Sequence, residues 1–163
     1  MVKFQGLPTS LSGNFPLVGE KAPEFSLCSH DLKELSSNSL IGKKIVLNIF
    51  PSVETEVCAM SVLTFREKLK DLNAELFNVS ADLPFASQRF GSSNGIDSSC
   101  FLSFYRSLFA HDYGVYISEG PLKGLSARAT VVIDEKGTVI HSELVSEITS
   151  EPNYEAVVLA LIN

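Results

Sequence analysis

The sequence lacks the features by which disulfide frameworks and structural metal sites are recognised. Only three cysteines occur in 163 residues, and none belongs to a Cys-x-x-Cys pair. An odd number of widely spaced cysteines does not make a disulfide framework. Without Cys-x-x-Cys, the sequence indicates neither a dithiol oxidoreductase nor a zinc knuckle. The three histidines are scattered along the chain. We therefore expect no metal and no cofactor.

Basic clusters and long apolar runs are also missing. The chain has 13 Lys and Arg against 19 Asp and Glu, a formal charge of −6, so a nucleic-acid footprint is absent. An acidic surface also disfavours anionic membranes. No apolar run approaches the roughly 18 residues that span a bilayer, and the N-terminus has no signal-peptide stretch. We expect a cytoplasmic protein with neither a nucleic-acid nor a membrane partner.

What the sequence does contain is the composition of an ordinary globular domain. Hydrophobic residues make up 45% and charged residues 20% of the chain, which excludes global disorder. No repeat, low-complexity tract or linker divides it, and its length suits one domain with a real core. We expect a single domain over residues 1–163, with residues 1–22 forming an N-terminal β-hairpin extension and a loop.

The clearest structural signal is a strand followed by a helix. Residues 45–50 form a β-branched apolar run, typical of a buried central strand, and Pro51 ends it. Thr55 is a plausible N-cap for the helix that follows. Apolar residues then recur at spacings of 4, 3, 4 and 3, which is one face of a helix. These residues are Cys58, Val62, Phe65, Leu69 and Leu72.

The remaining elements alternate between strands and helices. This order predicts an α/β domain with a thioredoxin-like fold, in which helices flank a mixed central sheet. The sheet is mixed because a hairpin lies near the C-terminus. The expected strands cover residues 75–79, 101–102, 129–133 and 139–144. The expected helices run from residue 82 to near Gly91, over 105–113, and after Pro152.

Cys58 stands where a reactive thiol is favoured. The first turn of a helix offers unpaired N–H groups and partial positive charge, and both stabilise a thiolate. The Thr55 hydroxyl, one turn back, can hydrogen-bond the sulfur or a substrate oxygen. The alternative is an inert core cysteine, because Cys58 also lies on the apolar stripe. Its place directly after a strand that ends in proline favours a site, since α/β folds bind ligands there.

At this point the sequence resembles a known family. Pro51-x-x-x-Thr55-x-x-Cys58 matches the peroxidatic motif of the peroxiredoxins. The surrounding residues 47–52 are similar to the thiol peroxidase branch of that family. Further matches keep their order along the chain, at residues 4–6, 80–86, 120–125, 127–129 and 151–156.

The resemblance implies an activity and roles for four residues. It implies a homodimer that reduces hydrogen peroxide and alkyl hydroperoxides through a Cys58 sulfenic acid, with a thioredoxin-like or other thiol reductant. Arg128 is the arginine that stabilises the thiolate and the transition state. Without the resemblance, Arg128 is an ordinary charge at a strand end. Thr55 positions the peroxide, and Pro51 shields the sulfenic acid from further oxidation.

The sequence departs from the family where a resolving cysteine is expected. Thiol peroxidases of this branch usually carry one shortly after the Asp-Leu-Pro-Phe segment, and this chain has Gly91 there. We therefore expect a one-cysteine cycle, in which an external thiol reduces the sulfenic acid. Cys100 is a possible resolving residue, because the flexible stretch 91–95 precedes it. Cys28 and Cys100 both lie in strand-like contexts, where a buried structural thiol is the alternative.

Two other functions remain open from the sequence. One is a thioredoxin-fold redox sensor or binding protein that oxidises slowly and signals through a partner. The other is a structural relative that has lost turnover together with the resolving cysteine. The presence of Pro51, Thr55, Cys58 and Arg128 together argues against the second.

Overall fold

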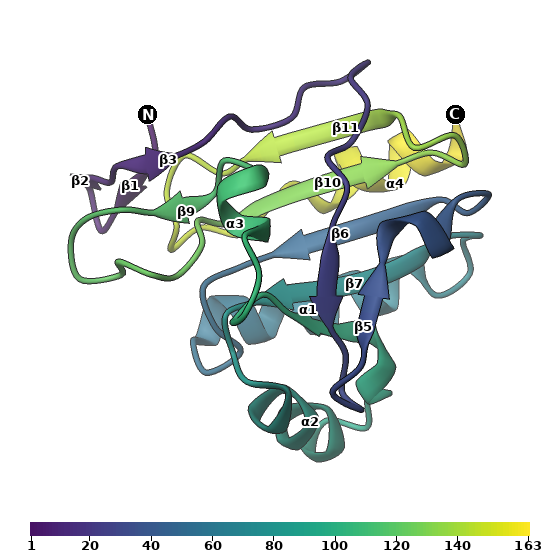
Figure 1. The fold of residues 1–163 in the computed structure, drawn as a ribbon, viewed down its shortest axis with the longest axis horizontal. Helices are drawn as coiled ribbons and strands as arrows, with labels where there is room; N and C mark the ends of the chain where they lie inside the picture. Colours follow the sequence, from purple (N-terminus) through teal and green to yellow (C-terminus); the bar gives the residue numbers. More distant parts are fainter.

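Strand β6 (Ile45–Ile49) is an interior strand of a seven-stranded sheet in the computed structural model, which describes residues 1–163 (Figure 1). All five of its residues are buried. It pairs antiparallel with β10 (Ala129–Ile133) on one side and parallel with β7 (Glu75–Ser80) on the other. The sheet is therefore mixed, as the sequence predicts, and its central strands are mostly apolar apart from the buried Asn48, Asn78 and Thr130.

The outer strands complete the sheet in the order β11-β10-β6-β7-β8-β4-β5. β10 and β11 form the expected hairpin, and Gly137 in its turn has a φ of 86°, a left-handed conformation that favours glycine. β7 and β8 are parallel, while β4 pairs antiparallel with both of its neighbours. The bounds are β4 (Ser26–Cys28), β5 (Glu34–Ser36), β8 (Phe101–Ser103) and β11 (Val139–Leu144).

Two helices cover one face of the sheet. α1 (Glu56–Leu69) and α4 (Tyr154–Ile162) lie behind the strands in Figure 1 and pack with the side chains that point to that face. Alternate residues of a strand point to opposite faces, so Val46 joins this helical layer while Leu47 joins the larger core on the other side. The layer contains Val46, Phe65, Leu69, Val132, Val157 and Leu161.

The other face carries the larger core and is covered by loops, short elements and the N-terminal segment. Phe25 packs edge-on against Phe109 of α3 (Phe109–Asp112), with ring centroids 5.9 Å apart. α2 (Pro84–Ser93) lies at the end of the molecule and packs against β8. Two 3-10 helices complete the chain, η1 (Ser37–Leu40) and η2 (Ser98–Cys100).

The N-terminus forms the expected hairpin, β1 (Lys3–Phe4) with β2 (Leu7–Pro8). Its two-residue turn, Gln5 and Gly6, has φ values of 51° and 80°, which suits the right-handed twist of a hairpin. The next strand, β3 (Leu11–Ser12), leaves the hairpin and pairs with β9 (Tyr116–Ile117). Lys3 also exchanges backbone hydrogen bonds with Ser146 and Ile148, so the extension is tied to two distant parts of the chain.

The sequence-based prediction of a helix over residues 105–113 is wrong for most of its length. Only the four residues of α3 are helical. Serine side chains hold the preceding turn, since the Ser103 hydroxyl accepts from the N–H of Tyr105 and the Ser107 hydroxyl accepts from that of Phe109. Such local side-chain bonds offer the backbone an alternative to a helix.

The strand-like placement of Cys100 is also wrong, whereas that of Cys28 in β4 is confirmed. Cys100 ends the 3-10 helix η2, directly before β8, because Asp97 caps this turn by accepting from the N–H of Ser99. α2 continues two residues past Gly91, to Ser93.

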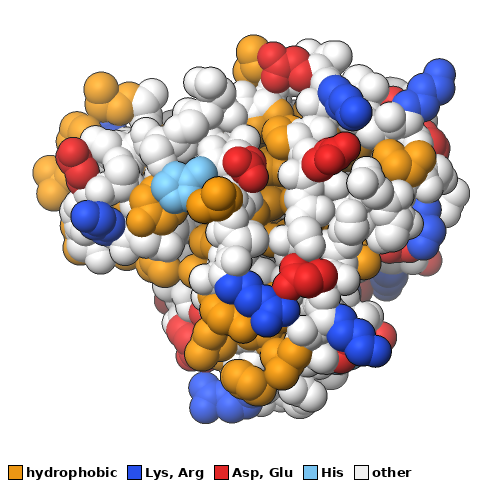
Figure 2. Space-filling model, viewed as in Figure 1, with side chains coloured by type: hydrophobic (Ala, Val, Ile, Leu, Met, Phe, Trp, Pro, Cys, Tyr) orange, Lys and Arg blue, Asp and Glu red, His pale blue; other side chains and the backbone are white.

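Neither the helices nor the charged side chains of the visible face (Figure 2) suggest a membrane-spanning segment or a continuous charged surface. None of the helices has the length and apolar character that a membrane crossing requires. On the face drawn in Figure 2, acidic and basic side chains are interspersed between apolar patches, and neither sign of charge forms a continuous surface.

Candidate active site

Cys58 lies in the first turn of α1, which a short loop joins to the buried strand β6. Phe50 and Pro51 end the buried run of β6, and Thr55 caps the helix, as the sequence predicts. The Cys58 side chain has no exposed surface. The thiol therefore sits at the positive end of a 14-residue helix and is shielded from bulk water.

The loop between Pro51 and the helix is held by Asp82, which the sequence analysis missed. One carboxylate oxygen of Asp82 accepts from the Ser52 hydroxyl at 2.7 Å, and the other accepts from the Val53 N–H at 2.8 Å. Asp82 follows β7, the parallel neighbour of β6, and the carboxyl ends of parallel strands meet at one edge of a sheet. The position of Asp82 directly after a predicted strand could therefore have marked it as a residue near the site.

The Thr55 hydroxyl makes its hydrogen bonds to the backbone. Its Oγ1 accepts from the N–H of Cys58 at 3.4 Å and donates to the carbonyl of Ser52 at 3.2 Å. These bonds are those of an N-cap, and they bind the first turn of α1 to the loop before it. The hydroxyl is exposed and faces the start of the helix that bears the thiol.

Arg128, which lies 70 positions after Cys58 in the sequence and directly before β10, contacts Cys58 in the fold. Its Nη2 donates to the Cys58 Sγ at 3.2 Å, and its Nε donates to the carbonyl of Ile148 at 2.9 Å. The third nitrogen, Nη1, is buried and donates to no protein acceptor. The role of the Ile148 carbonyl in orienting the guanidinium was not predicted, because every residue has a backbone carbonyl and its residue type does not show which ones accept hydrogen bonds.

The charge of Arg128 has no carboxylate to balance it. The side chain is 1% exposed, and the five salt bridges of the chain leave it out. A guanidinium stays charged in proteins, and burying a charge is costly unless an opposite charge pairs with it. The group in contact with it that can become an anion is the Cys58 thiol. The guanidinium and the Cys58 sulfur are therefore in direct contact in a buried site that holds no carboxylate.

Pro51 is buried where β6 turns into the loop. The side chains packed around Cys58 are Phe50, Val53, Val62, Ile96 and Phe101. This apolar surrounding keeps water away from the sulfur, and a charge interaction is stronger where water is excluded.

The other two cysteines lie outside this contact. Cys28 is buried in β4, and its thiol faces the carbonyl of Ser29 at 3.6 Å. Cys100 is half-buried, donates to the carbonyl of Asp97 at 3.0 Å and accepts from Asn78 at 3.6 Å. Burial is the main cause that raises the pKa of the Cys100 thiol above its usual value. No disulfide links any of the three cysteines.

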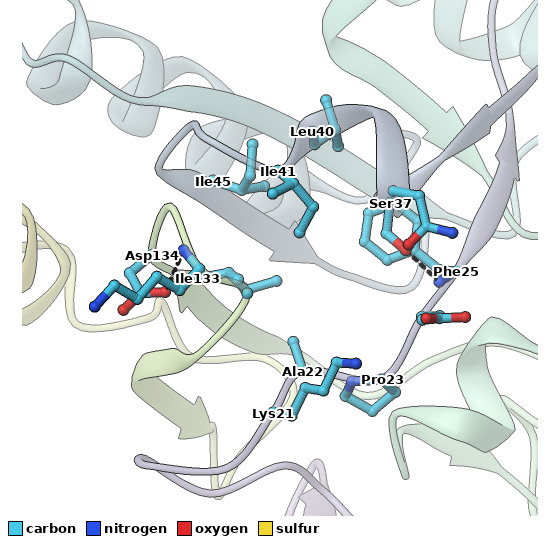
Figure 3. A pocket seen from close by; sticks show the side chains of 14 residues that line it. Lys21, Ala22, Pro23, Phe25, Ser37, Leu40, Ile41, Ile45, Ile133 and Asp134 are labelled. Carbon is cyan, nitrogen blue, oxygen red and sulfur yellow. Dashed lines mark hydrogen bonds between the residues drawn. The ribbon is translucent and has the colours of Figure 1, made fainter.

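A separate pocket of about 270 Å³ lies at the opposite end of β6, next to Ile45 and Ile133 (Figure 3). Its walls also come from the segment around Pro23 and from η1, and the Ser37 hydroxyl accepts there from the N–H of Phe25. No cysteine lines it. No three His, Cys, Asp or Glu side chains gather as metal ligands anywhere in the chain.

Comparison with known proteins gives a consistent result. The chain matches the Redoxin family over residues 17–158. The thiol peroxidase of Vibrio cholerae is 47% identical over 162 residues, which cover 98% of this chain and 99% of that protein. The thiol peroxidase of Corynebacterium glutamicum is 47% identical over 159 residues, with coverage of 97% and 96%. A peroxiredoxin-like protein from Aquifex aeolicus superposes with a TM-score of 0.91 at 37% identity, over 99% of this chain and 95% of that one.

Proposed function

Because this chain belongs to the Redoxin family, in the thiol peroxidase branch of the peroxiredoxins, we propose that it reduces hydroperoxides with Cys58 as the attacking nucleophile. The observation that carries the proposal is the 3.2 Å contact between the Arg128 Nη2 and the Cys58 Sγ, in a site where the guanidinium has no carboxylate partner. The buried cation stabilises the thiolate, which is the reactive form of a cysteine.

The Cys58 thiolate attacks the terminal oxygen of the peroxide. A sulfur–oxygen bond forms, the O–O bond breaks, and the other oxygen leaves with the electron pair and then takes a proton. The products are the Cys58 sulfenic acid and an alcohol, or water when hydrogen peroxide is the substrate. Negative charge moves from sulfur to the departing oxygen during this step. Arg128 can stabilise the charge at both positions, because Nη2 donates to the sulfur while the buried Nη1 is free to donate to the departing oxygen.

Thr55 and Pro51 have supporting roles in this proposal. The Thr55 hydroxyl, fixed at the start of α1, gives one of its hydrogen bonds to the peroxide and aligns the O–O bond with the sulfur. Pro51 shields the nascent sulfenic acid, whose further oxidation to sulfinic acid is irreversible in most proteins. Ile148 and Asp82 position the reacting groups, since one orients Arg128 and the other holds the loop before Cys58.

We propose a thioredoxin-like or other thiol as the reductant that returns Cys58 to the thiolate. Two routes are compatible with the chemistry, direct reduction of the sulfenic acid or reduction of a disulfide formed with Cys100. We also propose that residues 1–163 act as a single domain, with 1–22 as its N-terminal extension, and that the protein works in the cytoplasm as a homodimer. These features rest on the resemblance to thiol peroxidases.

The experiment that tests this function is peroxide consumption with an artificial dithiol as the electron source. We expect a fast second-order reaction in the wild-type chain and in Cys28→Ser, and its loss in Cys58→Ser. A hydroxyl is nearly the size of a thiol but is not ionised at neutral pH, so Cys58→Ser keeps the fold. A slow reaction in the wild type would favour the redox sensor instead, and a fast one in Cys58→Ser would exclude Cys58 as the nucleophile.

A further inference from the structure

A buried line of hydrogen bonds connects Cys58 to Cys100. The Cys58 carbonyl accepts from the Ser61 hydroxyl at 2.8 Å, and the Asn48 amide donates to that hydroxyl at 3.2 Å. The same Asn48 nitrogen donates to the Asn78 side-chain oxygen at 3.0 Å, and the Asn78 nitrogen donates to the Cys100 Sγ at 3.6 Å. The ends of the path therefore lie within about 15 Å of each other.

The two thiols also share one apolar cluster, centred on Val62, Ile96 and Phe101. Cys58 is a member of this cluster, and Cys100 packs against its edge. Cys28 is not a member of this cluster, and its thiol faces the carbonyl of Ser29. Of the two remaining cysteines, only Cys100 contacts the apolar cluster that contains Cys58.

An open groove of about 280 Å³ runs between α1 and the segment that carries Cys100. Cys100 lines it together with Val62 and Arg66 of α1, which stand one and two helical turns after Cys58. With a rise of about 1.5 Å per residue, these positions lie roughly 6 and 12 Å along the helix from Cys58. The α1 wall of the groove that Cys100 lines therefore begins one helical turn after Cys58.

The packing around Gly91 leaves little room for a side chain there. A Cβ at Gly91 would lie 3.0 Å from the carbonyl oxygen of Ile96 and 3.3 Å from the Phe101 ring. Both contacts are tighter than ordinary van der Waals separation, so a side chain at Gly91 must displace the segment around η2. The same segment carries Cys100, which is half-buried and lines the groove.

From these observations we propose that Cys100 is the resolving residue of this chain, which forms an intramolecular disulfide with oxidised Cys58. This inference rests on the proposed function, because it needs the Cys58 sulfenic acid. The Cys100 sulfur attacks the Cys58 sulfur, the S–S bond forms and the S–O bond breaks. The oxygen leaves as water with the Cys100 proton. A thiol reductant then supplies the two electrons that cleave the disulfide.

Two local rearrangements make the bond geometrically accessible. A disulfide needs Cα atoms within about 7 Å, so the first turn of α1, the η2 turn or both must open. η2 has three residues and no buried side chain, which makes its opening inexpensive. Gly95, with a φ of 65°, lies in the connection between α2 and η2 and allows that segment to turn.

The test is the intact mass of the full-length reduced chain after one equivalent of hydrogen peroxide. We expect the wild type to lose two hydrogens without gaining oxygen, and peptide mapping to find a disulfide between Cys58 and Cys100. Cys100→Ser should gain one oxygen at Cys58, trapped by a sulfenic-acid reagent, and Cys100→Ala should do the same. The matched control Cys28→Ser should behave as the wild type does.

Other outcomes separate this inference from the function beneath it. An oxygen gain at Cys58 in the wild type, unchanged by Cys100→Ser, would overturn the resolving role and leave the peroxidase intact, with a one-cysteine cycle. A disulfide to Cys28, or between two chains, would overturn it as well. If peroxide were not consumed and no mass changed in any variant, the proposed function and this inference would both be wrong.

Discussion

Cys58 and Cys100 share one apolar cluster, yet the chain gives them opposite chemical surroundings. Cys58 is fully buried at the start of a 14-residue helix, with a guanidinium 3.2 Å from its sulfur. Cys100 is half-exposed at the end of a three-residue turn, where its sulfur meets only an amide and a carbonyl. Under the proposed function, the comparison predicts that positive charge and preorganised donors, and not exposure, set the reactivity of the two thiols toward peroxide.

The largest loss of peroxide-reduction rate should come from removing the charge of Arg128, which lies beside Cys58 and not beside Cys100. We expect Arg128→Met to slow peroxide reduction by about 10²- to 10³-fold, the usual effect of deleting a donor to developing charge. The slowing should persist at a pH where Cys58 is ionised, because Arg128 also acts on the transition state. The measurement is the second-order rate constant as a function of pH.

Arg128→Lys is the matched variant for this comparison. It keeps the positive charge but lacks the planar fork with which the guanidinium spans the Cys58 sulfur and the Ile148 carbonyl, so we expect an intermediate rate. Alkylation of Cys100 should be unchanged in both variants. Full recovery of the Arg128→Met rate at high pH would mean that Arg128 acts only on ionisation.

A smaller loss should follow from removing the Thr55 hydroxyl. We expect Thr55→Val to slow peroxide reduction roughly tenfold, the equivalent of one hydrogen bond of ~1.4 kcal/mol, and to lower stability by about 1 kcal/mol through the lost N-cap. Thr55→Ser keeps the hydroxyl and should restore both. The rate of peroxide reduction and the urea midpoint separate the two effects. An unchanged rate in Thr55→Val would remove Thr55 from the chemistry and leave it as a cap alone.

Asn78→Leu should change the alkylation rate of Cys100 and leave the peroxide reaction of Cys58 unchanged. Burial raises the pKa of Cys100, and the Asn78 hydrogen bond works against that rise. Without the amide, the pKa of Cys100 should rise further and its alkylation should slow several-fold. The unfolding free energy should drop by about 1–3 kcal/mol, because the buried Asn48 donor loses an acceptor. Faster alkylation of Cys100 would contradict this assignment.

The smallest effect should appear at the loop that orients Arg128. The Glu147 carboxylate accepts from the N–H groups of Thr149, Gly6 and Gln5, which lowers its pKa from 4.5 to about 2. A depressed pKa contributes stability above pH 4.5, and this contribution is lost as the pH falls toward 2. Glu147→Gln should therefore be less stable than the wild type at pH 6, with the difference vanishing near pH 2.

The control for this pH dependence is Glu135→Gln, because the Glu135 carboxylate makes no hydrogen bond in the chain. Its stability should follow that of the wild type at every pH. A constant difference between wild type and Glu147→Gln over the whole range would show that the carboxylate is not what holds the hairpin to the loop.

Local patterns were enough to predict the helix that carries Cys58. The buried run of β6, the Thr55 cap and the apolar stripe of α1 are periodic or short-range signals, and the structure confirms all three. The Asp134–Gly137 turn likewise predicted the hairpin of β10 and β11. The family resemblance added Arg128, and the structure places it in contact with Cys58.

The contacts that the sequence could not supply are long-range or depend on the backbone. Asn48 reaches Asn78 across 30 residues, and Arg128 reaches a carbonyl 20 residues away. No periodicity encodes such pairs. The error at residues 105–113 has another cause, since serine hydroxyls compete locally with a helix that the apolar spacing favours.

One measurement tests most directly whether surroundings, not exposure, set the reactivity of the two thiols. The rate constants for hydrogen peroxide and for a bulky neutral alkylating reagent are measured in Cys100→Ser, which reports on Cys58, and in Cys58→Ser, which reports on Cys100. We expect Cys100→Ser to react far faster with peroxide and Cys58→Ser to react faster with the alkylating reagent, because that reagent needs access. Equal peroxide rates in the two variants, or a faster rate in Cys58→Ser, would contradict the assignment of Cys58 as the activated thiol.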